Sequence, residues 1–151
     1  MQETELFETF SQFKALFPKL VGILLKNIEI ELNKYKLNKS QMETLIFLCH
    51  TSFPTMGMIQ KRLNLTKGAV TGIISNFEDR NWVKRIHNTE DRRVVSVKLT
   101  KEGLAMAQKI KGLIAHEFDR QIKNLSDSDL SLLLTSLNNL NMIINKLEKN
   151  D

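Results

Sequence analysis

Basic side chains gather in the middle third of this 151-residue chain. Residues 55–103 carry ten Lys and Arg against five Asp and Glu, whereas residues 1–54 and 104–151 each carry six of either sign. The formal net charge of +5 therefore arises entirely in the middle third. A basic segment in a neutral frame is typical of a module that binds a polyanion such as nucleic acid. Ordinary solvated charge is the alternative, and charge alone does not decide between them.

Small and hydrogen-bonding side chains share one face of a helix predicted over residues 67–80. The opposite face of this helix is apolar (Val70, Ile73, Ile74 and Phe77). A hydroxyl can bond several bases and an Asn can bond adenine through two atoms, while Lys67 and the helix N-terminus favour a phosphate. Solvated positions, with Ser75 or Asn76 bonded locally, are the alternative. The predicted DNA-binding residues of this helix are Thr66, Lys67, Gly68, Thr71, Ser75 and Asn76.

Two adjacent arginines lie at the end of a polar loop over residues 88–92, where Arg92 is the last loop residue and Arg93 the first residue after it. The loop joins two predicted strands, residues 82–87 and 93–99, in a hairpin. An Arg on a thin loop can enter the minor groove of DNA, and we expect Asp91 to pair with an Arg and hold the loop in shape. Arg92 and Arg93 point to opposite sides of an alternating strand, so we expect different roles for them. A solvated charge run is again the alternative.

The first half of the chain predicts four helices. Apolar residues recur at helical spacing from Leu6 to Tyr35, and Pro18 predicts a kink or break near residues 14–17. Ser40 and Glu43 form a capping-box pattern for a second helix that ends near His50. Thr55 and Thr66 follow as caps of helices over residues 56–63 and 67–80. A tight turn at residues 64–65 joins these last two helices.

The last third of the chain predicts two long helices. Asn81 tolerates the left-handed conformation that ends the helix before the hairpin, Thr100 caps a fifth helix, and Ser126 with Asp129 caps a sixth. The sixth helix carries a heptad seam, which requires a partner helix. The first helix has a long apolar face that one small lobe cannot cover. The dimerisation residues predicted on these two helices are Phe10, Phe13, Phe17, Leu130, Leu133, Leu137, Leu140, Ile144 and Leu147.

Two short helices joined by a tight turn and followed by a two-stranded ribbon predict a winged helix-turn-helix. The fold class is mainly α with a small β-hairpin wing. We expect one domain over residues 1–151, with the DNA-binding lobe at residues 40–100. Residues 1–36 and 104–151 form the helical dimerisation region of this prediction.

The sequence closely resembles the MarR (multiple antibiotic resistance regulator) family over nearly its whole length. The resemblance rests on the order of elements, on the string Leu-Thr-Lys-Gly-Ala-Val-Thr at residues 65–71, and on the wing at residues 88–93 followed by residues 95–103. It implies an obligate dimer, built by the first, fifth and sixth helices, that represses promoters at palindromic sites. It also implies that Arg93 enters the minor groove with Asp91 as its brace, which leaves Arg92 for phosphate contact or bracing. Some members bind aromatic ligands between the dimer helices and the DNA-binding lobe, which implies a small aromatic effector as a partner.

No motif in the sequence predicts a cofactor, a metal site or enzyme activity. The three histidines and Cys49 lack ligand spacing, and no glycine-rich phosphate loop follows a strand. We expect Cys49 to be a buried small hydrophobe and His116–Glu117 to lie on a solvated or half-buried helix face. No apolar run approaches the roughly 18 to 20 residues needed to span a bilayer, and the acidic N-terminus does not resemble a secretory signal. The sequence therefore predicts a cytoplasmic protein without a membrane partner.

These observations predict a sequence-specific regulator of transcription that binds double-stranded DNA as a homodimer, acts as a repressor and is released by a small ligand. A winged-helix module for protein interaction, without specific DNA binding, is the first alternative. A small helical enzyme or ligand carrier is a more distant one.

Overall fold

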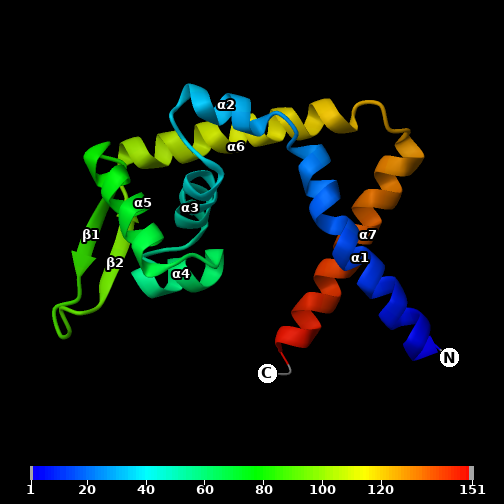
Figure 1. Cartoon of the computed structure of the whole chain (residues 1–151), viewed down its shortest axis with the longest axis horizontal. Helices are drawn as coiled ribbons and strands as arrows, with labels where there is room; N and C mark the ends of the chain where they lie inside the picture. Colours follow the sequence, from blue (N-terminus) through cyan, green and yellow to red (C-terminus); the bar gives the residue numbers. More distant parts are fainter. Residues whose placement is uncertain (1, 150–151) are drawn as a thin grey trace. The chain divides into compact units, whose positions relative to one another are not determined.

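The computed structural model describes residues 2–149, which form seven helices and one two-stranded antiparallel sheet (Figure 1). The mainly helical fold class with a small hairpin is therefore confirmed. The chain divides into two compact units, Met1–Leu24 with Phe118–Asp151 and Leu25–Glu117. The elements in chain order are α1 (Gln2–Leu24), α2 (Ile28–Lys34), α3 (Lys39–His50), α4 (Met56–Leu63), α5 (Lys67–Asp79), β1 (Val83–His87), β2 (Val95–Leu99), α6 (Lys101–Ile122) and α7 (Asp127–Glu148).

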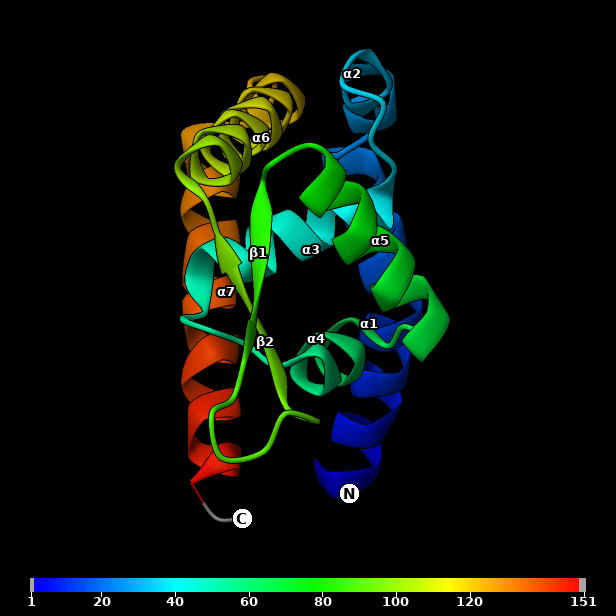
Figure 2. The ribbon, with the colours of Figure 1, turned by 90° about the vertical axis from the view of Figure 1, so that its left-hand side faces the viewer.

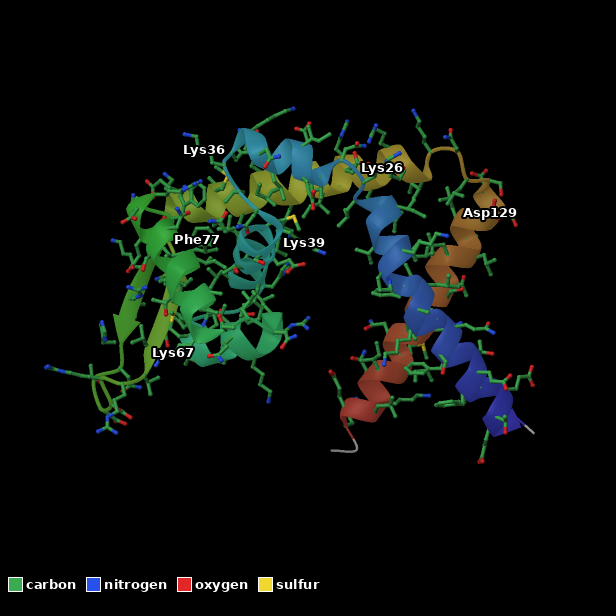
Figure 3. The ribbon with its side chains drawn as sticks, viewed as in Figure 1. Lys26, Lys36, Lys39, Lys67, Phe77 and Asp129 are labelled. Carbon is green, nitrogen blue, oxygen red and sulfur yellow. The ribbon has the colours of Figure 1, made fainter. Side chains whose placement is uncertain are left out.

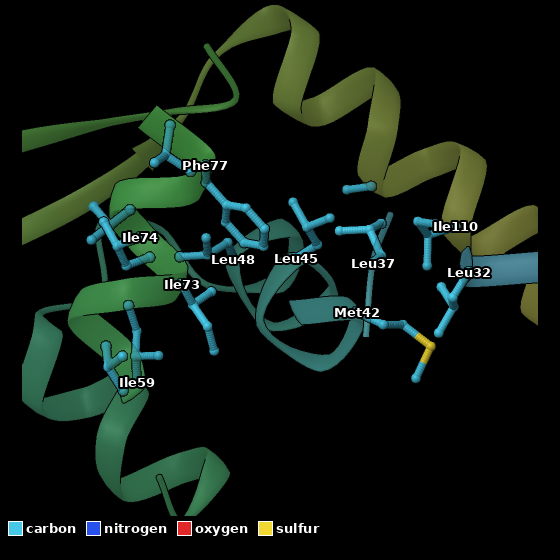
Figure 4. Close-up of a cluster of buried hydrophobic side chains, with 14 of the residues drawn as sticks. Leu32, Leu37, Met42, Leu45, Leu48, Ile59, Ile73, Ile74, Phe77 and Ile110 are labelled. Atoms are coloured by element: carbon cyan, nitrogen blue, oxygen red, sulfur yellow. The ribbon is translucent and has the colours of Figure 1, made fainter. Parts of the chain in front are cut away.

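The second unit has a continuous apolar core (Figure 4). The predicted apolar stripe of α5 is confirmed, since all four of its members are buried. They pack with buried side chains of α2, α3, α4, α6 and both strands, and Cys49 is half-buried at the edge of this core. Burial of this kind, at about 25 cal/mol per Å² of apolar surface, stabilises the helix-turn-helix against its neighbours. The core members that Figure 4 labels are Leu32, Leu37, Met42, Leu45, Leu48, Ile59, Ile73, Ile74, Phe77 and Ile110.

The apolar pattern from Leu6 to Tyr35 forms two helices rather than one. α1 continues through Pro18, so the break predicted near residues 14–17 is wrong, and the helix ends instead at Leu24. Pro18 has no N–H to donate to the carbonyl of Lys14. Lys14 is exposed, so water can bond this carbonyl instead and the helix continues.

The actual break lies between α1 and α2, where a contact with α6 stabilises it. Both the backbone N–H and the side-chain amide of Asn27 donate to Oε1 of Glu117, at 3.2 and 3.1 Å. Glu117 is 4% exposed, so its expected place on a solvated or half-buried face is wrong, whereas His116 is exposed. The carboxylate bonds Asn27, the N-cap of α2, and so fixes where the second helix begins.

The capping box of α3 lies two residues earlier than the predicted one. Oδ1 of Asn38 accepts from the backbone N–H of Gln41 at 2.9 Å, and Oε1 of Gln41 accepts from the backbone N–H of Asn38 at 2.9 Å. The box predicted at Ser40 and Glu43 is therefore wrong. The sequence contains two overlapping capping-box patterns. The earlier one forms because the chain turns just before Asn38, where Leu37 is buried.

Two threonine caps define the helix-turn-helix, as predicted. Oγ1 of Thr55 accepts from the N–H of Met58 and Oγ1 of Thr66 accepts from the N–H of Ala69, both at 3.2 Å. Between the two helices Asn64 is left-handed, with φ of 51°, and forms the turn. These local bonds fix where α4 and α5 begin.

The hairpin is shorter than predicted at its outer end. β1 pairs with β2 from Val83↔Leu99 to His87↔Val95 (Figure 2). β2 begins at Val95, so the strand predicted from Arg93 is wrong there, and Arg92 and Arg93 lie in a turn. Turn residues do not alternate, which removes the strand argument for their opposite directions.

The base of the hairpin is anchored on both sides. Thr55 pairs with Ser96, and the N–H of Val97 donates to the carbonyl of Pro54 at 2.9 Å. At the other side Asn81 is left-handed as predicted, with φ of 57°. The wing base is therefore attached to the start of α4 as well as to the end of α5.

The start of α6 explains the threonine and glycine that follow β2. Oγ1 of Thr100 donates to the carbonyl of Asn81 at 2.6 Å and accepts from the N–H of Gly103 at 3.0 Å, so the predicted cap is confirmed. A Cβ atom at Gly103 would lie 1.9 Å from the carbonyl oxygen of Trp82. Only glycine allows this approach of the helix to the chain before β1.

The capping box of α7 at Ser126 and Asp129 is confirmed. None of the residues of α7 is buried, although it carries the predicted heptad seam. Its Leu137, Leu140, Ile144 and Leu147 are 37–63% exposed. In α1 the phenylalanines at 10, 13 and 17 are 40–58% exposed. Both helices therefore keep large apolar side chains in solvent within the described chain.

Candidate nucleic-acid interface

The N-terminus of α5 is open to solvent. Thr66, Lys67 and Gly68 are exposed, and Figure 3 marks Lys67 at this end of the helix and Phe77 toward the other. The first backbone N–H groups of a helix lack partners inside it, and the cap of Thr66 satisfies only that of Ala69. An exposed helix N-terminus with a lysine beside it attracts an anionic oxygen.

The outward face of α5 changes character along its length. Thr71 and Gly72 are exposed, and a Cβ atom built on Gly68 or Gly72 would meet nothing within 4 Å. Packing inside this chain therefore does not require either glycine. The bare backbone at these two positions leaves room for an outside surface to approach the helix closely.

Ser75 and Asn76, further along α5, are half-buried and hydrogen-bonded within the protein. Oγ of Ser75 accepts from Nη2 of Arg85 at 3.0 Å. Oδ1 of Asn76 accepts from Nε2 of Gln41 at 3.3 Å. To contact bases through these oxygens, each residue would have to share or exchange such a bond, so their base-reading role stays a prediction.

The wing tip is held by side-chain oxygens that bond its own backbone. Oδ1 of Asn88 accepts from the N–H groups of Glu90 and Asp91, at 2.8 and 3.2 Å. Oδ1 of Asp91 accepts from the N–H of Arg93 at 2.9 Å. In residues 2–149 Asp91 forms no ion pair with Arg92 or Arg93, so the expected pairing with an Arg side chain is wrong. The carboxylate instead bonds the backbone of Arg93, because that amide lies two residues away in the turn.

A cavity of about 650 Å³ lies between the start of α4, the start of α5 and the wing. Its lining includes three basic side chains, Lys67, Arg85 and Arg93, together with His87. Thr71 also lines it, and no described residue in its lining is acidic. We call it the basic cavity. Arg93 lines it and Arg92 does not, so the two exposed arginines differ in what they face.

The structure brings together residues that the sequence did not connect. Lys67, Thr71 and Arg93 are predicted site residues that share the basic cavity. Arg85 joins them, and it also forms an ion pair with Glu78, with Nη1 at 2.9 Å from Oε2. Nothing in residue spacing indicates that a strand arginine reaches a helix across the intervening turn.

Residues 2–149 contain neither a metal-binding cluster nor a membrane-spanning helix. Within this range no group of three or more His, Cys, Asp or Glu is placed to hold a metal ion. Nor does any helix in the same range have the length and apolar character needed to cross a membrane.

A helix-turn-helix followed by an antiparallel hairpin defines a winged-helix protein, and solved structures share this fold. Streptococcus pneumoniae FabT in complex with DNA superposes with a TM-score of 0.69 at 22% identity, over 91% of this chain and 99% of that one. A mutant MarR from Escherichia coli complexed with operator DNA gives a TM-score of 0.65 at 23% identity, over 89% of this chain and 97% of that one.

The sequence model of the MarR family matches residues 37–95 of this chain. Among curated relatives, the transcriptional repressor YetL of Bacillus subtilis is 30% identical over 82 residues, which are 54% of this chain. The match spans 49% of the length of YetL. It follows that the likeness to YetL concerns about half of either protein.

Proposed function

We propose that this protein binds double-stranded DNA sequence-specifically and regulates transcription as a repressor. The basic cavity carries the proposal, because it joins the open N-terminus of α5 to the wing tip within one unit. A groove-reading helix and a basic hairpin beside it are the two parts with which winged-helix proteins grip a duplex. The relatives support the proposal, since YetL is named a repressor and the compared FabT and MarR structures contain DNA.

In the proposed complex α5 enters the major groove. Thr66, Lys67 and Gly68 lie at its N-terminus, where backbone N–H groups and the ammonium of Lys67 bind phosphate. Thr71 lies one turn further along and contacts base edges. Ser75 joins it by donating its hydroxyl to a base while its oxygen still accepts from Arg85, and Asn76 joins it by exchanging its bond with Gln41 for a bond to a base.

The two wing arginines have different proposed partners. Arg93 lines the basic cavity, so we place it in the minor groove beside the site that α5 reads. Arg92 lies outside that lining and contacts phosphate. Asp91 sets the position of Arg93 through the bond to its backbone N–H.

The active form in this proposal is a homodimer on a palindromic site. The exposed apolar side chains of α1 and α7 support it, because large apolar side chains gathered along a helix are typical of an interface with another protein surface. A two-fold dimer presents two α5 helices to two half-sites about 34 Å apart, one turn of the duplex. The interface comprises Phe10, Phe13, Phe17 and the heptad seam of α7.

We further propose a small aromatic effector that lowers DNA affinity, and action in the cytoplasm as a regulator rather than an enzyme. The rings of Phe13 and Phe17, 5.5 Å apart on α1, support it, because a ligand bound at the edge of the proposed dimer interface would meet this aromatic pair. A panel of aromatic acids and phenols tested against the DNA complex would detect it as release of DNA.

Sequencing the DNA that the protein retains from a fragmented genomic pool tests the proposed function. A repressor should enrich a few fragments that share a palindrome near promoters. A protein-interaction module would enrich no sequence, or would bind every fragment weakly. A reporter gene placed behind an enriched fragment should rise in expression when the gene for this protein is deleted, which distinguishes a repressor from an activator.

A further inference from the structure

The side of β1 that faces α5 becomes more exposed toward the tip of the wing. Side chains on the α5-facing side of β1 run from buried Val83 through half-buried Arg85 to exposed His87. In residues 2–149 Arg85 is the outermost residue of β1 that bonds α5. The position of Arg85 therefore controls how the outer part of the hairpin sits beside the helix.

Arg85 bonds two successive turns of α5 at once. Its Nη1 lies 2.9 Å from Oε2 of Glu78, and its Nη2 donates to Oγ of Ser75 at 3.0 Å. Ser75 and Glu78 are three residues apart, so they share one face of the helix. The planar guanidinium presents several donors in a fixed fork, which a lysine ammonium cannot reproduce.

We propose that Arg85 is a positioning residue for DNA binding, and we call Arg85 with Ser75 and Glu78 the Arg85 latch. The latch sets the spacing between α5 in the major groove and Arg93 in the minor groove, and it acts through Arg93 rather than by touching DNA. This inference rests on the proposed function. The charge of Arg85 is already paired with Glu78, so little of it remains to attract a phosphate.

Direct phosphate contact is the competing role for Arg85. Its side chain is 29% exposed and lines the basic cavity, so a phosphate could reach it. The two roles predict opposite signs when the carboxylate of Glu78 is removed. A latch is weakened and affinity falls, whereas a phosphate-binding arginine is freed from its counter-charge and affinity rises.

The first experiment measures the affinity of the full-length protein for its selected operator. Glu78→Gln is compared with Asp79→Asn, which removes the same charge from the neighbouring exposed residue. We expect Glu78→Gln to bind several-fold more weakly than Asp79→Asn. Affinity of Glu78→Gln equal to or above that of Asp79→Asn would overturn the latch.

The second experiment is a double-mutant cycle between Arg85 and Arg93. We expect Arg85→Ala to lose on the order of tenfold in affinity on an A/T-flanked operator, the scale of one good base contact. In the Arg93→Ala background the same change should lose twofold or less, because the residue that the latch positions is already gone. Additive losses would overturn the latch, since a phosphate contact is independent of Arg93.

Lys84→Ala is the matched control, because Lys84 is an exposed base on the other face of β1. It should show additive behaviour with Arg93→Ala. Unfolding midpoints show whether each variant is folded, and if Arg85→Ala is not, Arg85→Lys replaces it in the cycle with the same expected coupling. A wild-type chain that enriches no operator would overturn the proposed function together with the latch, whereas additive losses on a real operator overturn the latch alone.

Discussion

The unit that contains the wing buries its large apolar side chains, whereas the unit that contains α1 and α7 leaves many of them exposed. In Leu25–Glu117 the large side chains of α5 and α6 that point inward, such as Phe77 and Ile110, are fully buried. In the other unit α7 buries no residue, and Leu132 and Leu134 are more than 60% exposed. The unit Leu25–Glu117 has its own core, whereas α1 and α7 leave apolar faces exposed, and the proposed dimer would cover these faces.

The difference separates two uses of the same kind of residue. A heptad seam in α7 and an apolar stripe in α5 both satisfy helical periodicity, and only the environment distinguishes them. Helical periodicity predicts that an apolar helix face packs against another surface, but it does not identify that surface. The seam of α7 and the outward face of α5 can therefore be tested separately.

Charge in the seam of α7 should have the largest effect. Replacing Leu137 and Leu140 with Lys places two ammonium groups in the proposed interface, where an unpaired buried charge costs several kcal/mol. We expect monomer or insoluble protein by sedimentation, and loss of palindrome binding. Asn138→Lys with Asn141→Lys repeats the charges at the same spacing outside the seam and should remain dimeric. A wild-type chain that sediments as a monomer at micromolar concentration would contradict the dimer.

Loss of the minor-groove arginine should come next. Arg93→Ala is expected to lose about 1 to 3 kcal/mol of binding free energy on A/T-flanked operators and to erase the preference for such flanks. Arg92→Ala should weaken A/T- and G/C-flanked operators equally, because a phosphate contact is indifferent to base composition. Asp91→Ala should resemble a milder Arg93→Ala, since it removes the bond to the backbone N–H of Arg93. Titrations on paired operators that differ only in their flanks decide this, and full flank preference in Arg93→Ala would refute the assignment.

Salt should reveal how many phosphates the dimer contacts. If about six to eight are neutralised, the slope of log affinity against log salt should be about −5 to −7. Lys67→Ala should weaken all operators alike and bring the slope nearer to zero by about two, one for each subunit. Lys39→Ala, at the exposed start of α3 and away from the basic cavity, serves as the control. A flat salt dependence would favour the protein-interaction module.

Local bonds were predictable from the sequence and distant ones were not. The caps at Thr55, Thr66 and Ser126 bond amides three residues away, so a short pattern contains both partners. The bond between Asn27 and Glu117 joins residues 90 positions apart. No sequence pattern in either segment predicts this bond, so the sequence predicts the end of the first helix at the wrong place.

In the candidate site, too, local features were predictable from the sequence and contacts between distant segments were not. The exposed end of α5 at Lys67 follows from its cap and its apolar stripe, both local. The hydrogen bond from Arg85 to Ser75 depends on how β1 folds back onto α5, so the sequence could present Ser75 only as a side chain on the outward face. The wing turn is intermediate, because Asn88 and Asp91 are typical turn residues, yet which amide each would bond was not evident.

The smallest predicted effect concerns Gly72. Glycine inside a helix costs about 0.5 to 1 kcal/mol relative to alanine, and a Cβ at Gly72 would meet no atom of this chain. Gly72→Ala should therefore raise the free energy of unfolding by up to about 1 kcal/mol. Its effect on DNA depends on how closely α5 approaches the groove, and we expect a measurable loss of affinity because the added methyl group occupies the approach path.

Gly112→Ala in α6 is the matched control, because it separates the gain in stability from the loss of DNA affinity. Gly112 is also exposed, and an added Cβ there meets nothing within 4 Å, so the two variants should gain similar stability. Only Gly72→Ala should bind the operator more weakly, because Gly112 lies outside the basic cavity. Chemical denaturation and operator titration of both variants separate the two quantities. Equal operator affinity in the two stabilised variants would show that α5 does not need its bare backbone to bind DNA, and the glycine would then have no role at the interface.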